Sequence, residues 1–409
     1  MRLPLCRQQS RVTFAMQRVG LAVKGHPLAL ASSVAREAHA ARRVVLVAGG
    51  TAGHVYPALA IAKAYLQHLP STEVLFVGTP DGFEAKLVPR YGHPLLMVRS
   101  TPVVGETLVR KVRTVGSMGG AVMRARRLLT AANPDLVIGF GGYASVPTIL
   151  AARSLGVPTA IHEGNVVAGL ANKMLSRFVD RVYLGFAEAM KEFQTGRVLV
   201  TGNPVRPDVA ALANQLHDAP SPGQPYRILV TGGSEGSFFL NRQVPKLLAR
   251  LASGGLTLEV LHQSGVADQD SVREAYREVS LKSSVTPFVE DMAKAYQWAD
   301  FAITCSGAAT LAEAAIVGLP LLPVPLSTAT KNHQVFNAIA FARVTGAFWL
   351  SENAWKSDEP DKKIAALLSH QMAWREASES VRRFARPEAN QTLVKDSEAM
   401  VKARRLERK

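Results

Sequence analysis

The stretch VVLVAGGTAGH, at residues 44–54, joins a short apolar run to a glycine-rich turn. Its first five residues have the length and the β-branched content of a buried parallel strand. The turn 49–54 follows directly, and Pro57 predicts that a helix opens soon after it. A strand, a glycine turn and a helix in this order indicate the start of a doubly wound α/β domain.

The same alternation continues along the first half of the chain. Apolar runs that predict further strands are separated by segments with helical patterning. The expected strands are Val44–Ala48, Val74–Val77, Leu136–Phe140, Thr159–His162 and Arg181–Leu184, and the expected helices are Pro57–Leu69, Val122–Ala132 and Thr148–Leu155.

A proline-rich stretch, Pro204–Pro225, interrupts this rhythm and is typical of an interdomain connection. The alternation then restarts, which predicts a second α/β domain, and a charged helical tail follows, interrupted at Pro387. The second domain is expected to contain strands at Arg227–Thr231, Thr257–His262, Phe301–Thr304 and Leu321–Val324, with helices at Asn241–Leu251, Asp291–Trp298 and Thr310–Val317.

The fold class is therefore α/β, with two Rossmann-like doubly wound domains that face a shared cleft. In such sheets, ligands bind outside the carboxyl ends of the strands. We place a basic extension at 1–42, the first domain at 43–205, a linker at 206–225, the second domain at 226–370 and a helical tail at 371–409.

The composition limits the choice of partners. The formal net charge of +16 predicts an anionic partner. Nucleic acid is disfavoured, because the basic residues are dispersed and no recognition helix, zinc finger or RNA-binding signature occurs. No apolar run reaches the roughly 20 residues that span a bilayer, so contact with a membrane should be peripheral. The two cysteines, Cys6 and Cys305, predict free thiols in a reducing compartment.

The first 43 residues contain eight Arg or Lys residues and one acidic residue, Glu37. Such a start is compatible with a transit peptide, with a misassigned start codon or with a flexible basic tail. It lacks the continuous apolar segment of a secretory signal. These alternatives stay open.

Polar or glycine-rich loops follow several of the predicted strands. Backbone amides in such loops, at the start of a helix, suit the binding of a diphosphate. His54 in the first loop could accept a proton from an attacking hydroxyl, although a surface or capping histidine is the simpler alternative. In the second half, Ser234 and Arg206 could neutralise a diphosphate, and the carboxylate of Glu313 could accept both hydroxyls of a ribose.

The order of these motifs along residues 43–385 resembles the MurG family of glycosyltransferases. The motifs are the glycine loop with His54, Gly141-Gly142-Tyr143, the segment 162–173, Gly202-Asn203-Pro204-Val205-Arg206, Gly232-Gly233-Ser234, Ser306–Glu313 and the segment 333–338. The resemblance implies a GT-B fold, with a membrane-facing acceptor domain before a donor domain. It implies transfer of N-acetylglucosamine, with inversion, from UDP-N-acetylglucosamine to undecaprenyl-diphosphoryl-N-acetylmuramoyl-pentapeptide. No cofactor and no metal are expected.

The resemblance also implies roles for individual residues. His54 is the candidate base, and Glu313 the ribose ligand. The acceptor-side loop is Gly141, Gly142 and Tyr143. The other donor-binding residues would be Thr51, Ala52, Gly53, Asn165, Arg206, Ser234, Val289, Ala308, Ala309, Thr310, Leu311, Ala312 and Gln334. The implied location is the cytoplasmic face of a bacterial plasma membrane, in peripheral contact, with organelle targeting by residues 1–42 left open.

Three departures from the family pattern affect this interpretation. Ala52 replaces a usual glycine, while Gly164 and Glu235 each replace a usual glutamine. Glu235 would repel a diphosphate unless its side chain points away. The alternatives are another GT-B enzyme, such as a glycolipid synthase or a UDP-sugar 2-epimerase, and an inactive protein that binds a UDP-sugar or a lipid. The sequence does not predict the oligomeric state.

Two segments of the first half combine apolar residues with cations and are candidates for membrane contact. They are residues 108–113 and 124–129. Basic segments gain roughly 1 kcal/mol per charge beside anionic lipid. An ordinary solvated helix face explains either segment equally well.

Overall fold

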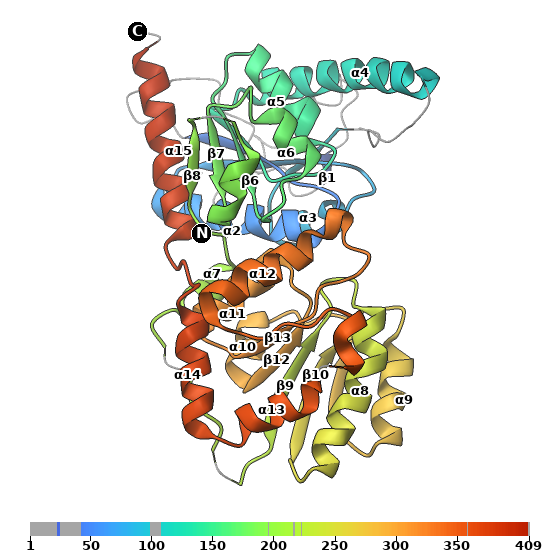
Figure 1. The fold of residues 1–409 in the computed structure, drawn as a ribbon. Helices are drawn as coiled ribbons and strands as arrows, with labels where there is room; N and C mark the ends of the chain where they lie inside the picture. Colours follow the sequence, from blue (N-terminus) through green and yellow to red (C-terminus); the bar gives the residue numbers. More distant parts are fainter. Residues whose placement is uncertain are drawn as a thin grey trace, which may run out of the picture. The chain divides into compact units, whose positions relative to one another are not determined.

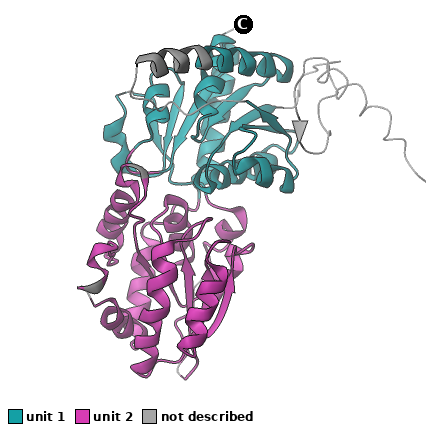
Figure 2. Ribbon diagram, turned by 90° about the vertical axis from the view of Figure 1, so that its right-hand side faces the viewer, with its two compact units in different colours: residues 1–164, 168–204, 388–409 teal, residues 165–167, 205–387 magenta. Residues whose placement is uncertain are grey.

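The computed structural model describes residues 42–98, 108–194, 196–215, 217–221, 223–357 and 359–407, together with the strand Val23–Lys24. For residues 23–24, 108–117, 330 and 356 it describes the backbone alone. The chain forms two compact units (Figure 2). The first comprises 1–164, 168–204 and 388–409, and the second comprises 165–167 and 205–387.

The first unit is built on one sheet, in the upper part of Figure 1. Its strand order is β1-β4-β3-β2-β5-β6-β7-β8. All neighbouring pairs are parallel except β1–β4, which is antiparallel. The strands are β1 (Val23–Lys24), β2 (Arg43–Val47), β3 (Glu73–Gly78), β4 (Leu95–Met97), β5 (Leu136–Gly139), β6 (Thr159–Glu163), β7 (Arg181–Leu184) and β8 (Val198–Val200).

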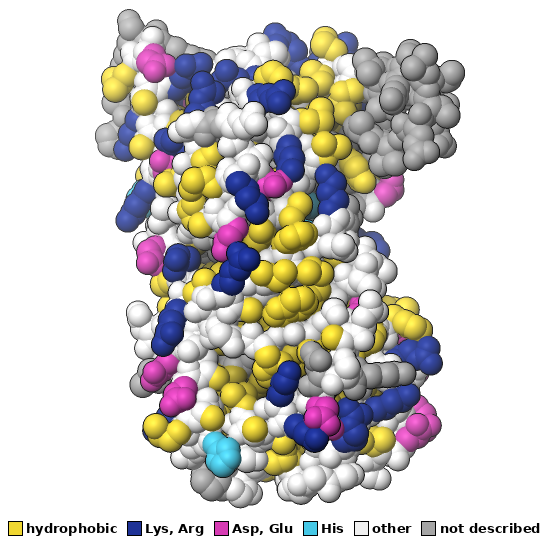
Figure 3. Space-filling view, viewed as in Figure 1, with side chains coloured by type: hydrophobic (Ala, Val, Ile, Leu, Met, Phe, Trp, Pro, Cys, Tyr) yellow, Lys and Arg dark blue, Asp and Glu magenta, His cyan; other side chains and the backbone are white. Residues whose placement is uncertain are grey.

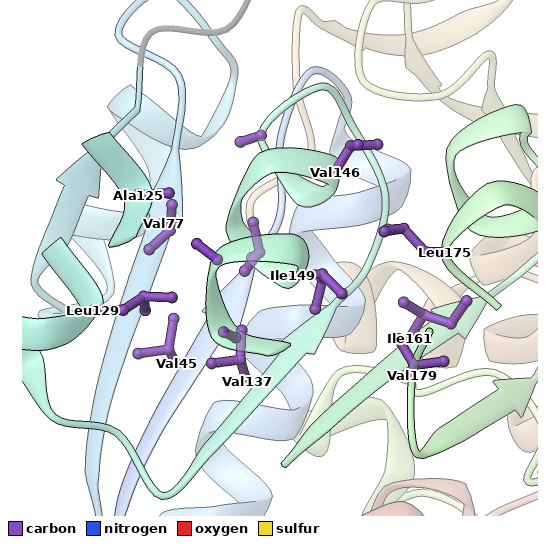
Figure 4. Close-up of a cluster of buried hydrophobic side chains, with 14 of the residues drawn as sticks. Val45, Val77, Ala125, Leu129, Val137, Val146, Ile149, Ile161, Leu175 and Val179 are labelled. Carbon is purple, nitrogen blue, oxygen red and sulfur yellow. The ribbon is translucent and has the colours of Figure 1, made fainter. Parts of the chain in front are cut away.

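Successive side chains of a strand point to opposite faces of a sheet, so each buried strand contributes side chains to the cores on both faces. Val45 of β2 and Val137 of β5 belong to the core beneath α4 (Leu108–Ala132), α5 (Ser145–Ser154) and α6 (Leu170–Leu175) (Figure 4). These strands are buried on both faces, as the continuous apolar runs predict.

Helix α2 (Ala52–His68) begins five residues earlier than the sequence predicts. Pro57 does not open the helix but lies inside it, in its second turn. Its ring cannot donate a hydrogen bond to the carbonyl of Gly53, four residues earlier, and only one such bond is lost. Thr51 is therefore the N-cap residue, and His54 lies in the first turn of the helix. The short strands β1, β4 and β8 of this unit were not predicted, and neither were α3 (Glu84–Arg90) and the 3-10 helix η1 (Ala187–Glu192).

The C-terminal helix α15 (Ala389–Leu406) belongs to the first unit and packs beside α2. Tyr65 of α2 hydrogen-bonds with Ser397, and burial raises the pKa of this tyrosine. Arg42 pairs with Glu398 at 2.7 Å, and the carboxylate of Asp396 accepts from Arg181 at 2.9 Å. The predicted tail 371–409 is thus divided between the two units near Pro387, where the sequence predicts an interruption.

We expect the packing of α15 to contribute strongly to the stability of the first unit. Leu393 is fully buried in this helix, whereas Leu406 is 74% exposed. Leu393→Ala should lower the free energy of unfolding by about 2–5 kcal/mol, because it leaves a cavity. Leu406→Ala is the control and should change it by less than about 0.5 kcal/mol. Thermal and denaturant unfolding measure the stability of both variants. Equal losses of stability in the two variants would contradict a stabilising role for the buried packing of α15.

The second unit contains a five-stranded parallel sheet with the order β11-β10-β9-β12-β13. Its strands are β9 (Tyr226–Thr231), β10 (Leu258–Gln263), β11 (Lys282–Thr286), β12 (Phe301–Thr304) and β13 (Leu321–Pro323). The sequence predicted four of these and missed β11, an edge strand in which four of the five residues, Lys-Ser-Ser-Val-Thr, are polar.

Helices cover both faces of this second sheet. One core contains α7 (Pro207–Ala210), α10 (Met292–Trp298), α11 (Ala308–Val317), α12 (His333–Thr345) and α14 (Gln371–Arg382). The other contains α8 (Phe238–Ser253), α9 (Gln269–Glu278), α13 (Pro360–Leu368) and the 3-10 helix η3 (Asn353–Lys356). A further 3-10 helix, η2 (Thr330–Asn332), precedes α12. The stretch predicted as a linker packs on this unit, because Val209 is fully buried and Leu212 is 7% exposed.

The surface agrees with the dispersed charge that the sequence indicates. Figure 3 shows Lys and Arg side chains scattered over the visible face, among hydrophobic and neutral ones. None of the helices within the described ranges has the length and apolar character needed to cross a membrane.

Candidate active-site loops

The strand orders determine where the predicted loops lie. In each sheet the order reverses at one point, between β2 and β5 in the first unit and between β9 and β12 in the second. Ligands of doubly wound sheets bind at this point, outside the carboxyl ends of the strands. The glycine loops that follow these four strands are therefore the candidate site loops of their own units.

In the first unit, the imidazole of His54 is held by the glycine loop that precedes it. Its Nδ1 lies 2.9 Å from the carbonyl oxygen of Gly49 and 3.3 Å from the hydroxyl oxygen of Thr51. A carbonyl oxygen only accepts hydrogen bonds, so Nδ1 carries the proton. In the neutral ring, Nε2 is then the basic nitrogen.

The loop after β5 packs directly against this imidazole. A Cβ added at Gly141 would lie 2.7 Å from Nε2 of His54, and one at Gly142 would lie closer than 3.0 Å to the carbonyl oxygen of Gly49. Both glycines also have positive φ, 109° and 84°. The two loops thus fit together only without side chains, and Tyr143 beside them is 50% exposed.

The end of β6 and the segment after it contain buried polar side chains. His162 is 2% exposed, and burial lowers its pKa to about 3, so this imidazole stays neutral. The carboxylate of Glu163 accepts from the amide of Gly169 and from the side chain of Asn172, both at 2.9 Å. Asn172 lies in the first turn of α6 but does not cap it, because the N-cap residue is Gly169 and Asn172 instead donates to the end of β6, to the carbonyl of His162 and to Glu163.

Sequence reasoning missed Glu84, although it contacts the loop that holds His54. This carboxylate is fully buried and accepts from the amide of Gly50 at 3.0 Å. It also accepts from the amide of Thr79 at 2.7 Å and from its hydroxyl at 2.8 Å. The available signal was a glutamate that directly follows Gly82-Phe83 after a predicted strand, which alone indicates only a helix start.

In the second unit, the loop after β9 is packed backbone against backbone. A Cβ at Gly236 would lie closer than 3.0 Å to Ser264, and one at Gly265 closer than 3.0 Å to the carbonyl of Glu235. Ser234 is half-buried in this loop, and the side chain of Glu235 is exposed. The main chain of Glu235, rather than its carboxylate, therefore contacts the neighbouring loop.

A buried hydrogen-bond network supports the same loop. Nδ2 of Asn241 donates to the carbonyl of Ser264 and to Asp268, both at 2.8 Å, and its Oδ1 lies 3.0 Å from His262. The other nitrogen of His262 lies 2.9 Å from the hydroxyl of Tyr276. Burial lowers the pKa of His262 to about 3 and raises the pKa of Tyr276.

Glu313 is buried in α11 and has three donors on its carboxylate. The guanidinium of Arg206 lies at 2.9 Å, the amide of Arg206 at 3.4 Å and the hydroxyl of Tyr296 at 3.2 Å. Burial raises the pKa of Glu313, while the Arg206 cation opposes this rise. The structure thus brings Arg206 to Glu313, where the sequence placed it at a diphosphate; a buried carboxylate requires such a partner.

Val289 is joined to the loop after β9 by Gln263, which sequence reasoning did not identify. The side-chain amide of Gln263 donates to the carbonyl of Gly233 at 2.6 Å, and Oε1 of Gln263 accepts from the amide of Val289 at 2.8 Å. Because this amide is already bonded, a uracil contact by Val289 would use its carbonyl.

The residues predicted along α11 do not all lie at its exposed end. Ala308, Ala309 and Thr310 are half-buried at the start of the helix. Leu311 is fully buried in the core, and its amide donates to the carbonyl of Gly307 at 3.0 Å. Ala312 is 8% exposed and belongs to the same core. Of these five residues, only the first three are partly exposed.

Two further predicted residues, Gln334 and Asn165, form hydrogen bonds that involve side chains of α12. Gln334 accepts from the amide of Leu326 at 3.1 Å. Asn337 is fully buried and donates to Asn165 at 3.0 Å and to the carbonyl of Ser306 at 3.2 Å, so it orders two predicted segments together.

The described residues contain no group of three or more His, Cys, Asp or Glu side chains that could hold a metal ion. Cys305 is a buried free thiol whose pKa is raised by burial. Cys6 lies outside the described residues.

The similarity of this chain to known proteins agrees with the loops described above. Family models described as the glycosyltransferase family 28 N-terminal and C-terminal domains match residues 44–184 and 227–393. The chain belongs to glycosyltransferase family 28. Both matched regions include the loops described above, so the glycosyltransferase class that the sequence predicts is confirmed.

A curated relative from Magnetococcus marinus is 38% identical over 365 residues, which cover 89% of this chain and 99% of the relative. It is named UDP-N-acetylglucosamine--N-acetylmuramyl-(pentapeptide) pyrophosphoryl-undecaprenol N-acetylglucosamine transferase. Among solved structures, MurG of Acinetobacter baumannii is 31% identical with a TM-score of 0.71, over 88% of this chain and 99% of that one.

A UDP-GlcNAc 2-epimerase from Neisseria meningitidis has a TM-score of 0.59 at 14% identity, over 86% of this chain and 98% of that one. A likeness at this identity shows the fold alone. The predicted GT-B class, with two Rossmann-like parallel-sheet domains, is confirmed.

Proposed function

We propose that the protein transfers N-acetylglucosamine from UDP-N-acetylglucosamine to the muramoyl sugar of undecaprenyl-diphosphoryl-N-acetylmuramoyl-pentapeptide. The anomeric centre is inverted, and UDP is released. The observation that carries the proposal is the 38% identity, over nearly the whole length, to a relative named for this transfer. The loops of both units supply the chemistry that the reaction requires.

The first unit supplies the base. With Nδ1 of His54 donating to Gly49, Nε2 has the lone pair that accepts the proton of the muramoyl hydroxyl. The missing side chain of Gly141 keeps space beside this nitrogen. As the hydroxyl loses its proton, its oxygen attacks the anomeric carbon, and the bond to the UDP oxygen breaks.

The second unit binds the donor. Glu313 accepts the ribose hydroxyls, since a carboxylate can accept two hydrogen bonds at once. Arg206 and Tyr296 hold its oxygens in place. Ser234, the amides of its loop and the first amides of α11 stabilise the charge that develops on the diphosphate. Gln334 and Asn165 contact the sugar, and Thr51 to Gly53 remain proposed donor contacts.

The test follows label from UDP-N-acetylglucosamine into a lipid-linked muramoyl-pentapeptide acceptor. We expect a disaccharide lipid and one UDP for each transfer. Conversion of the donor to its 2-epimer without acceptor would favour an epimerase. UDP binding without turnover would favour an inactive binder. Transfer to a diacylglycerol or another lipid acceptor, but not to the muramoyl acceptor, would favour a glycolipid synthase.

We also propose peripheral contact with an anionic membrane, on the cytoplasmic face where the lipid-linked acceptor would be supplied. Leu170 and Met174 in α6 and Phe178 just after it are 50–55% exposed, and Arg177 is exposed beside Phe178. We call these four residues the α6 patch. Exposed apolar side chains beside cations favour a charged lipid surface.

The segments predicted for this contact fit less well. Leu128 and Leu129 of the segment 124–129 are buried in the core, while Arg124 and Arg127 are exposed. That segment therefore offers charge without apolar surface. The side chains of residues 108–113 lie outside the described residues.

Replacement of Met174 by glutamate should weaken binding to vesicles that contain anionic lipid by roughly tenfold or more, since burying such a side chain contributes about 1.5–3 kcal/mol. Met372→Glu, at a methionine 67% exposed in the second unit, is the matched control. Co-sedimentation with vesicles measures both. Equal weakening by the two variants would attribute the effect to charge alone and reject the α6 patch.

A further inference from the structure

Glu84 has no part in the chemistry proposed above, yet it is a fully buried carboxylate at the base of the His54 loop. Burying a charged group is costly unless hydrogen bonds compensate it. Its hydrogen-bond partners are all donors: the amide of Gly50, the amide of Thr79 and the hydroxyl of Thr79. This set suits a carboxylate, which only accepts.

Three glycines make the space for this carboxylate. A Cβ added at Gly49, Gly78 or Gly82 would lie closer than 3.0 Å to the side chain of Glu84. These glycines come from the ends of β2 and β3 and from the turn before α3. Glu84 therefore fills a pocket that exists because three neighbouring positions lack side chains.

The contact between Glu84 and Gly50 leads to His54. Gly50 has a positive φ of 87°, and its amide points to Oε2 of Glu84. The residue before it, Gly49, presents the carbonyl that accepts from Nδ1 of His54. A change in the Gly49–Gly50 peptide would therefore move the group that fixes the imidazole, and small misplacements can cost roughly a hundredfold in rate.

We infer that Glu84 is a positioning residue, which holds the Gly49–Gly50 turn in the conformation that orients His54. The inference rests on the proposed role of His54 for its effect on the rate. Its effect on the loop does not depend on that role. Glu84 touches the loop and not the reacting atoms.

The test combines a rate with a signal from the loop. In Glu84→Gln one side-chain oxygen becomes an NH2 group, so at least one of the facing donors loses its acceptor. We expect kcat for transfer to fall roughly ten- to hundredfold, with the KM for the donor little changed. Glu398→Gln is the matched control, since Glu398 is also a buried carboxylate of the first unit and pairs with Arg42.

The loop signal is the NMR resonance of the Gly50 amide. Glycine labelled with carbon-13 at the carbonyl and nitrogen-15 at the amide gives carbonyl-coupled signals only where one glycine follows another, at Gly50, Gly120, Gly142, Gly233 and Gly255. Whichever atom of glutamine faces Gly50, the amide no longer donates to a charged carboxylate, so its proton should shift upfield and exchange faster with solvent. The signals of Gly233 and Gly255, in the second unit, should stay in place.

A second variant displaces the carboxylate without removing it. Gly82→Ala puts a methyl group against the Glu84 oxygens, and it should lower kcat and shift Gly50 as Glu84→Gln does. Gly119→Ala is its control, because nothing lies within 4 Å of a Cβ there.

The outcomes separate this inference from the proposed function. An unshifted Gly50 signal in Glu84→Gln, or a loss of rate no larger than in Glu398→Gln at equal thermal stability, would overturn the role of Glu84. If His54→Ala keeps full turnover while Glu84→Gln shifts Gly50, the base assignment fails and the inference that Glu84 holds the loop stands.

Discussion

Replacement of His54 by alanine should lower kcat for sugar transfer by roughly 100- to 10,000-fold, the usual contribution of a general base. The affinity for UDP should change little, because the side chain of His54 is not among the donor contacts proposed here. Steady-state kinetics with the lipid-linked acceptor, together with calorimetric titration of UDP, measure the two quantities separately. Of all the substitutions considered, this one should have the largest effect.

Two further variants define what His54 does. His54→Asn can still donate to the carbonyl of Gly49 but cannot accept a proton at physiological pH, so its kcat should stay as low as that of His54→Ala. His68→Ala is the matched control, since His68 is an exposed residue at the other end of α2. Recovery of rate in His54→Asn would assign the residue a structural role. Full turnover in His54→Ala would remove it from the mechanism.

The second large effect is expected for Glu313. Glu313→Gln should raise the KM for the UDP-sugar by roughly ten- to hundredfold, because hydrogen bonds to a charged group contribute about 1.5–3 kcal/mol. The substitution also leaves the half-buried guanidinium of Arg206 without its carboxylate. Asp361→Asn is the control, because it removes another Arg–carboxylate pair of this unit, with Arg250, away from the loops. An equal KM in the two variants would exclude Glu313 from donor binding.

The pH dependence supplies an independent signature of Glu313. The ribose hydroxyls bind the ionised carboxylate, which is present above its pKa. Burial raises this pKa, so kcat/KM for the donor should fall on acidification at a higher pH than an ordinary glutamate would cause. In Glu313→Gln this dependence should disappear. If the fall of kcat/KM at acidic pH persists unchanged in Glu313→Gln, the titration of another group causes it.

Many of the candidate site loops could be predicted from local sequence patterns. A strand, then a glycine loop, then a helix start places backbone amides at the carboxyl end of a sheet, and this identified the loops at His54, Gly141 and Ser234. Leu311 shows the limit of such reasoning. It lies inside a motif, but a helix turns each residue by about 100°, so Leu311 points into the core.

The partners of the buried carboxylates could not be predicted from the sequence. Arg206 and Glu313 are 107 residues apart in sequence, and Gly50 and Glu84 are 34 apart. No periodicity or spacing predicts such pairs, because they depend on which strands become neighbours. The same holds for α15, whose patterning predicts a helix but not that it packs beside α2 in the first unit.

The sequence by itself determined the α/β class, the two-domain order, the positions of the loops and the resemblance to the MurG family, because these depend on residue types at short spacing. Only the tertiary structure decided that Nδ1 of His54 is held by Gly49, that Arg206 pairs with Glu313 and that Glu84 supports the first loop. The physical reason is that a buried polar group must find a partner wherever the packed chain provides one, however far away it lies in the sequence.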